Sequence, residues 1–170
     1  MSNLAGQLAE RPGPLVIVSS GAIALGRAAL GIEGRPASLA EAQAAAAVGQ
    51  IQLARTWADV WTEVDRKAAQ LLLTLDDLED RGRYLNARNT VETLLDRGVV
   101  PIVNENDTVA TGEIRFGDND RLGARVALLA GAELLLLLSD VDGLFDADPR
   151  RNPDARLIAD VPVVDAAIEA

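Results

Sequence analysis

Four short apolar runs alternate with longer stretches of helical periodicity along the chain. The runs have the length and the continuous hydrophobicity of strands that are buried on both faces. They are Leu15–Val18, Ala68–Leu73, Val99–Val103 and Leu134–Leu138. Helical periodicity covers residues 22–30, 38–64, 86–97 and 118–129. This alternation predicts an α/β sandwich with a largely parallel sheet.

Local signals set the ends of the predicted helices. Ser38 and Glu41 have the spacing of a capping box, which begins the long alanine-rich helix. Gly49 predicts an interruption or a bend within that helix. A glycine commonly ends a helix because it adopts the left-handed conformation without strain. The glycines in such positions are Gly31, Gly98 and Gly131.

Three segments need a separate interpretation. Pro101 lies in the third apolar run, although a proline is awkward in a central strand because it has no N–H to donate. Residues 76–83 are rich in charge and predict a solvated connection. Residues 108–116 alternate apolar and polar side chains around Thr111-Gly112, which predicts a short hairpin that projects from the sheet as a candidate lid.

Composition restricts the chemistry. The chain has 170 residues, 49% hydrophobic and 25% charged, with a mean hydropathy of +0.12, as is typical of one soluble domain. No apolar run approaches the roughly 20 residues of a membrane span, and no secretory signal begins the chain, so we expect a cytoplasmic protein. The net charge of −10 argues against nucleic-acid binding. Without cysteine or histidine, any chemistry uses carboxylates, arginines, hydroxyls and backbone amides, and suits a small charged ligand with Mg²⁺.

Polar residues follow three of the predicted strands, at the edge where open parallel sheets bind ligands. After the first strand, Ser20 and Gly21 open a helix whose free N–H groups attract a carboxylate or a phosphate. Ser20 would equally serve as a simple N-cap of that helix. After the fourth strand, Ser139 and Asp140 suit either a nucleotide contact or an Asx-type turn.

The third strand is followed by the most informative stretch. Asn104–Asp107 and Asp118–Asp120 lie on either side of the predicted hairpin. Asp107 suits a substrate ammonium group, and Asn119 suits a carboxylate. Asp118, Asn119 and Asp120 are also typical helix caps, but two polar turns around one hairpin favour a binding site.

Six segments, in this order and spacing, resemble the glutamate 5-kinase family of amino acid kinases from Leu15 onward. They are Val16–Ala24, Val48–Gln50, Leu85–Thr90, Asn104–Ala110, Gly117–Asp120 and Ser139–Phe145. The resemblance implies the three-layer α/β/α sandwich of the amino-acid-kinase fold. It implies ATP-dependent phosphorylation of the glutamate side-chain carboxylate to glutamyl 5-phosphate, the first step of proline synthesis. It also implies Mg²⁺, a homo-oligomer and feedback inhibition by proline.

The resemblance also assigns residues, position by position. It implies glutamate contacts for Ser20, Asp107 and Asn119, and nucleotide contacts for Ser139 and Asp140. It implies no general base, because the substrate carboxylate is itself the nucleophile, and we assign no catalytic residue and no metal ligand. The expected supporting residues are Gly21, Asn106, Asp118 and Asp120.

The chain departs from the family pattern where phosphate is bound. Family members begin with a strand that carries a lysine, and they carry a second lysine in a later glycine-rich segment. The single lysine of this chain, Lys67, matches neither. We therefore expect residues 1–170 to form one incomplete amino-acid-kinase domain that lacks the first strand, the C-terminal part of the domain and the C-terminal RNA-binding-like domain. Such a chain should be poorly stable and inactive by itself.

Two alternatives stay open. Another kinase of this fold, such as N-acetylglutamate kinase or aspartokinase, would act on a different carboxylate, although the stretch 104–120 argues against it. The missing lysines favour a different class, a non-catalytic regulatory module that binds glutamate or proline and ignores nucleotide.

Overall fold

The chain divides after Leu135 into two compact units, and a parallel sheet forms the centre of the first. The computed structural model describes residues 2–11, 13–109 and 118–164. Within them the sheet has three strands in the order β1-β3-β2. Its register pairs Ile17 with Ile102 and Ala68 with Val100. The strands are β1 (Ile17–Val18), β2 (Ala68–Leu73) and β3 (Val100–Glu105).

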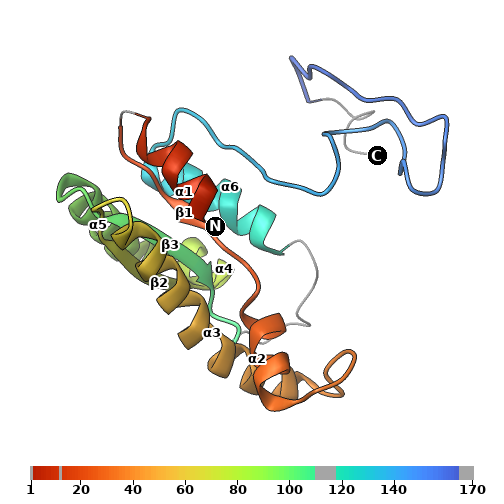
Figure 1. The fold of residues 1–170 in the computed structure, drawn as a ribbon. Helices are drawn as coiled ribbons and strands as arrows, with labels where there is room; N and C mark the ends of the chain where they lie inside the picture. Colours follow the sequence, from red (N-terminus) through yellow and green to blue (C-terminus); the bar gives the residue numbers. More distant parts are fainter. Residues whose placement is uncertain (1, 12, 110–117, 165–170) are drawn as a thin grey trace. The chain divides into compact units, whose positions relative to one another are not determined.

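Helices cover both faces of this sheet, as Figure 1 shows. One face packs against α1 (Ser2–Ala9), α2 (Ala22–Leu30) and α3 (Leu39–Thr62). The other face packs against α4 (Leu75–Glu79), α5 (Arg81–Asp96) and α6 (Asp118–Ala130). Because strand side chains alternate, Val100 and Ile102 join the α3 side of the core while Val103 joins the α5 and α6 side. The predicted three-layer α/β/α arrangement with a parallel sheet is confirmed.

Pro101 is buried in the central strand, and the register explains why it is tolerated. Val100 donates its N–H to the Lys67 carbonyl on the β2 side, so the nitrogen of the next residue faces β1. The ladder with β1 begins one residue later, where Ile17 pairs with Ile102. β1 is therefore shorter than the predicted run from Leu15, because Pro101 has no donor for an earlier rung.

The sequence predicted an interruption or a bend near Gly49, and the structure shows no interruption, since α3 runs through this residue. A Cβ at Gly49 would collide with the backbone carbonyl of Ala22, and a Cβ at Gly26 would collide with that of Ala45. These two glycines therefore let α2 and α3 cross backbone to backbone. The predicted capping of this helix is confirmed, since the Ser38 hydroxyl accepts a hydrogen bond from the Glu41 N–H.

The connection over residues 76–83 is largely exposed, as predicted, but the sequence analysis did not predict that it is helical. It forms α4 and the first turn of α5. Thr74 caps α4 in a full capping box, in which its hydroxyl accepts from the Asp77 N–H and the Asp77 carboxylate accepts from the Thr74 N–H. Arg83 then donates its backbone N–H to the Asp80 carboxylate at the start of α5. Asp77 and Asp80 thus take part in capping the two helices.

The predicted fourth strand over 134–138 is also wrong. None of its five leucines lies in a strand, and they are between 42% and 76% exposed. An apolar run indicates burial but carries no information on which strand edge would pair with it. The predicted hairpin over 108–116 falls mostly on residues outside those described. Among the described residues, no helix is long and apolar enough to cross a membrane.

The described residues of the second unit contain turns and no helix. Phe145 and Leu157 form an isolated antiparallel bridge, supported by a hydrogen bond from the Ile158 N–H to the Leu144 carbonyl.

Candidate functional site

The carboxyl ends of β1 and β3 bring two of the predicted polar clusters to one edge of the sheet. The strands are parallel neighbours, and the ladder continues into the loop because Ser19 donates its N–H to the Val103 carbonyl over 2.8 Å. Ser20 follows β1, and Asp107 follows β3 by two residues. Figure 1 shows α6, which carries Asn119 in its first turn, beginning at the same end of the sheet.

Gly21 shapes the turn between β1 and α2. Its φ of 107° lies in the left-handed region, which a residue with a side chain adopts only with strain. Gly21 is the N-cap of α2, and no side chain caps the helix there. The simple interpretation of Ser20 as an N-cap is therefore wrong. Ser20 is exposed at the sheet edge.

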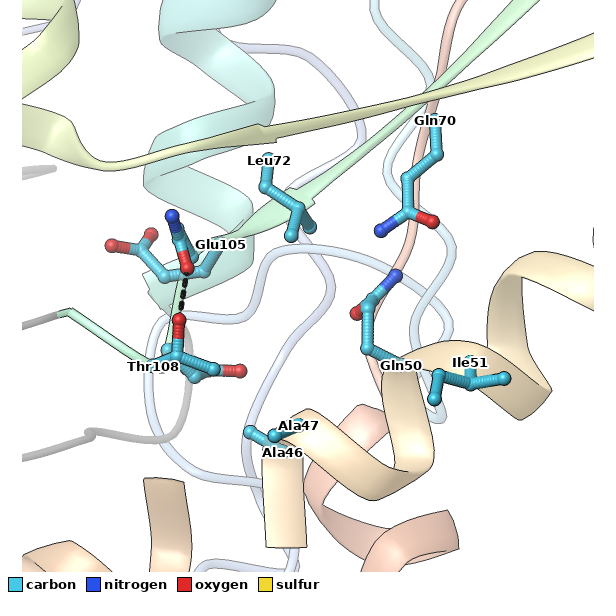
Figure 2. A pocket seen from close by; sticks show the side chains of 10 residues that line it. Ala46, Ala47, Gln50, Ile51, Gln70, Leu72, Glu105 and Thr108 are labelled. Carbon is cyan, nitrogen blue, oxygen red and sulfur yellow. Dashed lines mark hydrogen bonds between the residues drawn. The ribbon is translucent and has the colours of Figure 1, made fainter. Parts of the chain in front are cut away.

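A pocket of about 280 Å³ opens between the middle of α3 and the ends of β2 and β3. Its wall is apolar on one part and polar on another, which suits a small molecule that has methylene groups and charges. Figure 2 shows the side chains from α3, β2 and the segment after β3 around this space. The described residues that line it are Ala46, Ala47, Gln50, Ile51, Gln70, Leu72, Glu105, Asn106, Asp107 and Thr108.

Asn104 is buried beside this pocket and holds one of its lining residues, Gln50, by a hydrogen bond. It is 2% exposed, and its side chain points to the α3 face because it continues the alternation of Val100 and Ile102. Its Nδ2 donates to Gln50 Oε1 over 2.7 Å, and its Oδ1 accepts from the Glu105 N–H over 2.9 Å. A buried amide with partners on both atoms has a fixed orientation, so Gln50 is fixed as well.

The segment after β3 supplies the acidic part of the wall. Asn106 donates its N–H to the Leu73 carbonyl, and its Oδ1 accepts from the Thr108 hydroxyl over 2.6 Å. These bonds hold the turn that carries Asp107, which is half-buried. The predicted residues Asp107 and Asn106 thus line one pocket.

The structure does not place all predicted substrate residues in that pocket. Ser20 and Asn119 are not among its described lining residues. Asn119 Oδ1 is nevertheless buried and has no hydrogen-bond partner in the described residues. An unpaired acceptor suits an ammonium donor, whereas the sequence predicted that Asn119 would hold a carboxylate. Asp120 is exposed in the same first turn as Asp118.

Sequence reasoning missed the two glutamines of the pocket. Gln50 stood inside a motif but received no role, and Gln70 was taken as a strand residue. Only the packing of α3 across the sheet brings them together, and this contact leaves no periodic signal along the chain.

Comparison with known proteins gives the family. Residues 1–169 match the sequence profile of the amino acid kinase family. The chain belongs to the amino acid kinase family. Within this family it is 58% identical over 156 residues to a glutamate 5-kinase of Stutzerimonas stutzeri, which covers 92% of the chain. Glutamate 5-kinases of Nitrobacter hamburgensis and Rhodopseudomonas palustris are 61% and 60% identical over the same share. The chain spans only 41–42% of the length of these three relatives.

The two predicted nucleotide-binding residues, Ser139 and Asp140, make only local contacts among the described residues. Ser139 Oγ accepts from the Val141 N–H over 3.4 Å, which is a local turn, and Asp140 forms an ion pair with Arg150. Both predicted nucleotide residues are exposed in the second unit. The segment forms a turn through the Ser139 hydroxyl and not through an aspartate side chain as in the predicted Asx-type turn, and the nucleotide contact stays a prediction.

The fold shows where the single lysine lies relative to the pocket. Lys67, the single lysine, precedes β2 and accepts a hydrogen bond from Val100 at the amino end of the sheet. It therefore lies at the opposite end of β2 from the pocket. Among the described residues, no cluster of three or more acidic side chains could hold a metal ion.

Proposed function

We propose that the protein carrying this chain uses ATP to phosphorylate the side-chain carboxylate of glutamate, which gives glutamyl 5-phosphate in the first step of proline synthesis. The observation that carries the proposal is the identity of 58–61% across 92% of the chain with proteins named glutamate 5-kinase. The pocket supports it, because an acidic segment and amide groups surround an apolar floor of the size that a small amino acid needs.

In this proposal, the turns at the sheet edge bind the amino acid. Asp107 accepts hydrogen bonds from the ammonium group, and the unpaired Asn119 Oδ1 adds a second acceptor. Ser20 and the free N–H groups at the start of α2 face the carboxylate that reacts. Ser139 and Asp140 contact the nucleotide. The supporting residues are Gly21, Asn106, Asp118 and Asp120.

Because the nucleophile is a carboxylate, the protein needs to position it and needs no base to deprotonate it at neutral pH. ATP supplies the phosphoryl group, and Mg²⁺ is normally held by the phosphates with one or two carboxylates. Lys67 is at the wrong end of the sheet to neutralise the phosphates.

The same proposal extends to the setting of the enzyme. We take residues 1–170 as part of one amino-acid-kinase domain in a cytoplasmic homo-oligomer that proline inhibits. The net charge of −10 suits small cationic and zwitterionic ligands better than nucleic acid.

The test is an assay of the natural gene product that carries this sequence. Trapping of the acyl phosphate with hydroxylamine should show ATP-dependent turnover of glutamate well above that of aspartate or N-acetylglutamate. A preference for either of the latter would overturn the substrate, and no turnover with any of them would overturn the reaction.

The position of Lys67 favours one other function, a module that binds glutamate or proline without catalysis. Calorimetric titration of the same protein distinguishes the two. A kinase binds both glutamate and MgATP, whereas a regulatory module binds the amino acid and gives no heat with the nucleotide.

A further inference from the structure

We infer that Gln50 of α3 binds the α-carboxylate of the substrate and thereby selects a free amino acid over its α-amide. The inference rests on the proposed function and deepens it. Gln50 lies in the wall of the pocket, and the orientation of its side-chain amide determines what it can bind.

The hydrogen bonds of Asn104 set this orientation. Asn104 Oδ1 already accepts from the Glu105 N–H, so its Nδ2 is the donor to Gln50. Gln50 must therefore present its oxygen to Asn104 and turn its Nε2 away. Figure 2 shows this nitrogen turned toward the amide of Gln70, which also lines the pocket. The Gln50 nitrogen makes no hydrogen bond with any described residue, so its two N–H groups are available to an acceptor.

The rest of the wall fixes which acceptor fits. Asp107 and Glu105 give one part of the pocket a negative charge, and the amides give another part hydrogen-bond donors. The apolar part of the lining comes from side chains such as Ala46, Ala47 and Leu72. A zwitterion with a short aliphatic chain satisfies all three parts, with its ammonium group at the carboxylates and a carboxylate at the amides.

The chemistry decides between the two carboxylates of glutamate. The side-chain carboxylate attacks the phosphoryl donor, so it must face outward to the nucleotide. The α-carboxylate takes no part in the reaction and can be enclosed. Gln50 is half-buried and is hydrogen-bonded to the buried Asn104, so it suits the enclosed α-carboxylate.

Gln50→Glu tests the inference in the natural gene product. The new carboxylate still accepts from Asn104, but it replaces the two N–H donors by a charge that repels the α-carboxylate. It can accept from the N–H₂ group of glutamate α-amide, which keeps the reacting side chain. We expect the affinity for glutamate, measured by calorimetry, to fall at least about 10-fold while that for the α-amide changes less than about 3-fold.

Gln52→Glu is the matched control, because Gln52 lies on the same helix, is exposed and does not line the pocket. It should leave both affinities within about 2-fold of the wild type, since screened surface charges act weakly. If Gln50→Glu lowers the melting temperature by more than the control, Gln50→Met replaces it. This variant removes the donors without adding charge, and it should abolish the preference for glutamate over the α-amide.

The possible outcomes distinguish the role of Gln50 from the proposed function. A Gln50 variant that keeps the wild-type preference overturns the inference and leaves the proposed function standing. Equal losses for both ligands also overturn it, because they indicate a structural role. A wild-type protein that binds neither ligand overturns the proposed function and the inference with it.

Discussion

The Trp57 indole Nε1–H donates a hydrogen bond of 2.9 Å to Ser19 Oγ, and both side chains are buried. The Ser19 hydroxyl in turn lies 3.3 Å from the Ser20 carbonyl, to which it donates. This chain of two bonds joins the long helix α3 to the turn between β1 and α2. It holds the peptide between Ser20 and Gly21 in one orientation, so the start of α2 is presented to the sheet edge in a fixed way.

Trp57→Phe should therefore destabilise the protein more than Trp61→Phe. Both substitutions remove the same atoms from the same core, but Trp61 Nε1 is buried without a hydrogen-bond partner in the described residues. The lost bond should make Trp57→Phe costlier by about 1 kcal/mol in urea unfolding. An equal or larger cost for Trp61→Phe would show that the indole–serine bond contributes nothing.

The contact between Gly26 and Gly49 gives a second prediction. A methyl group at either position meets backbone carbonyl oxygen, which cannot move aside as a side chain would. We expect Gly49→Ala to lower the free energy of unfolding by roughly 3 kcal/mol or more. Gly123→Ala is the control in α6, where a Cβ meets nothing within 4 Å, and it should stabilise the helix by about 0.5–1 kcal/mol. A mild effect at Gly49 would mean that the two helices separate without cost.

Asp77 gives a dependence of stability on pH. The hydrogen bond from the Thr74 backbone N–H is the main cause that holds the Asp77 pKa below its ordinary value of 3.8, and Thr74 Oγ1 and Arg83 add to it. A lowered pKa stabilises the folded state fully above pH 3.8, and this contribution is lost as the pH falls through the folded-state pKa. The stability difference between the wild type and Asp77→Asn should thus shrink on acidification below pH 3.8. Urea unfolding at several pH values measures it, and a difference that grows on acidification would contradict the assignment.

Asp107→Asn tests the acidic end of the pocket. It removes the charge that faces the substrate ammonium group in the proposed site and nearly keeps the volume of the side chain. The KM for glutamate should rise about 10-fold to 100-fold, because a hydrogen bond to a charged group is lost. Steady-state rates at varied glutamate measure it in the natural gene product. Asp96→Asn, exposed at the end of α5, removes the same charge and should leave the KM unchanged; a rise in both variants would indicate a general electrostatic effect.

Local signals explain what could be predicted from the sequence. Gly31 and Gly131 both end their helices in the left-handed conformation, as expected of glycine after a helical stretch. The bounds of β2 and the α/β alternation with a parallel sheet also followed from periodicity, whereas the three-layer order was implied by the family resemblance. By the same reasoning, Thr74 and Asp77 carry a capping-box spacing like that of Ser38 and Glu41, and α4 was missed because its charged residues were taken for a loop.

Other features depend on contacts between distant parts of the chain. Gly49 looked like a break because its partner, Gly26, is more than 20 residues away along the printed sequence. Leu134–Leu138 has the composition of a strand, but hydrogen-bond partners are not encoded in a run of leucines. The sequence singled out Asp107, which lines the pocket, because it lies in a polar turn just after a strand. It did not single out Gln50, because the contact of Gln50 with Asn104, 54 positions later, leaves no local signal.

Pro101 has a consequence for where the turn between β1 and α2 emerges. A strand can slide past its neighbour only if each new position offers the same donors and acceptors. On the β1 side, β3 offers no donor at residue 101, so β1 cannot add a rung toward its own amino end and gains nothing from a shift in that direction. The missing N–H of Pro101 thus fixes the register of β1 against β3. This register sets the position along the sheet at which Ser19, Ser20 and Gly21 leave β1.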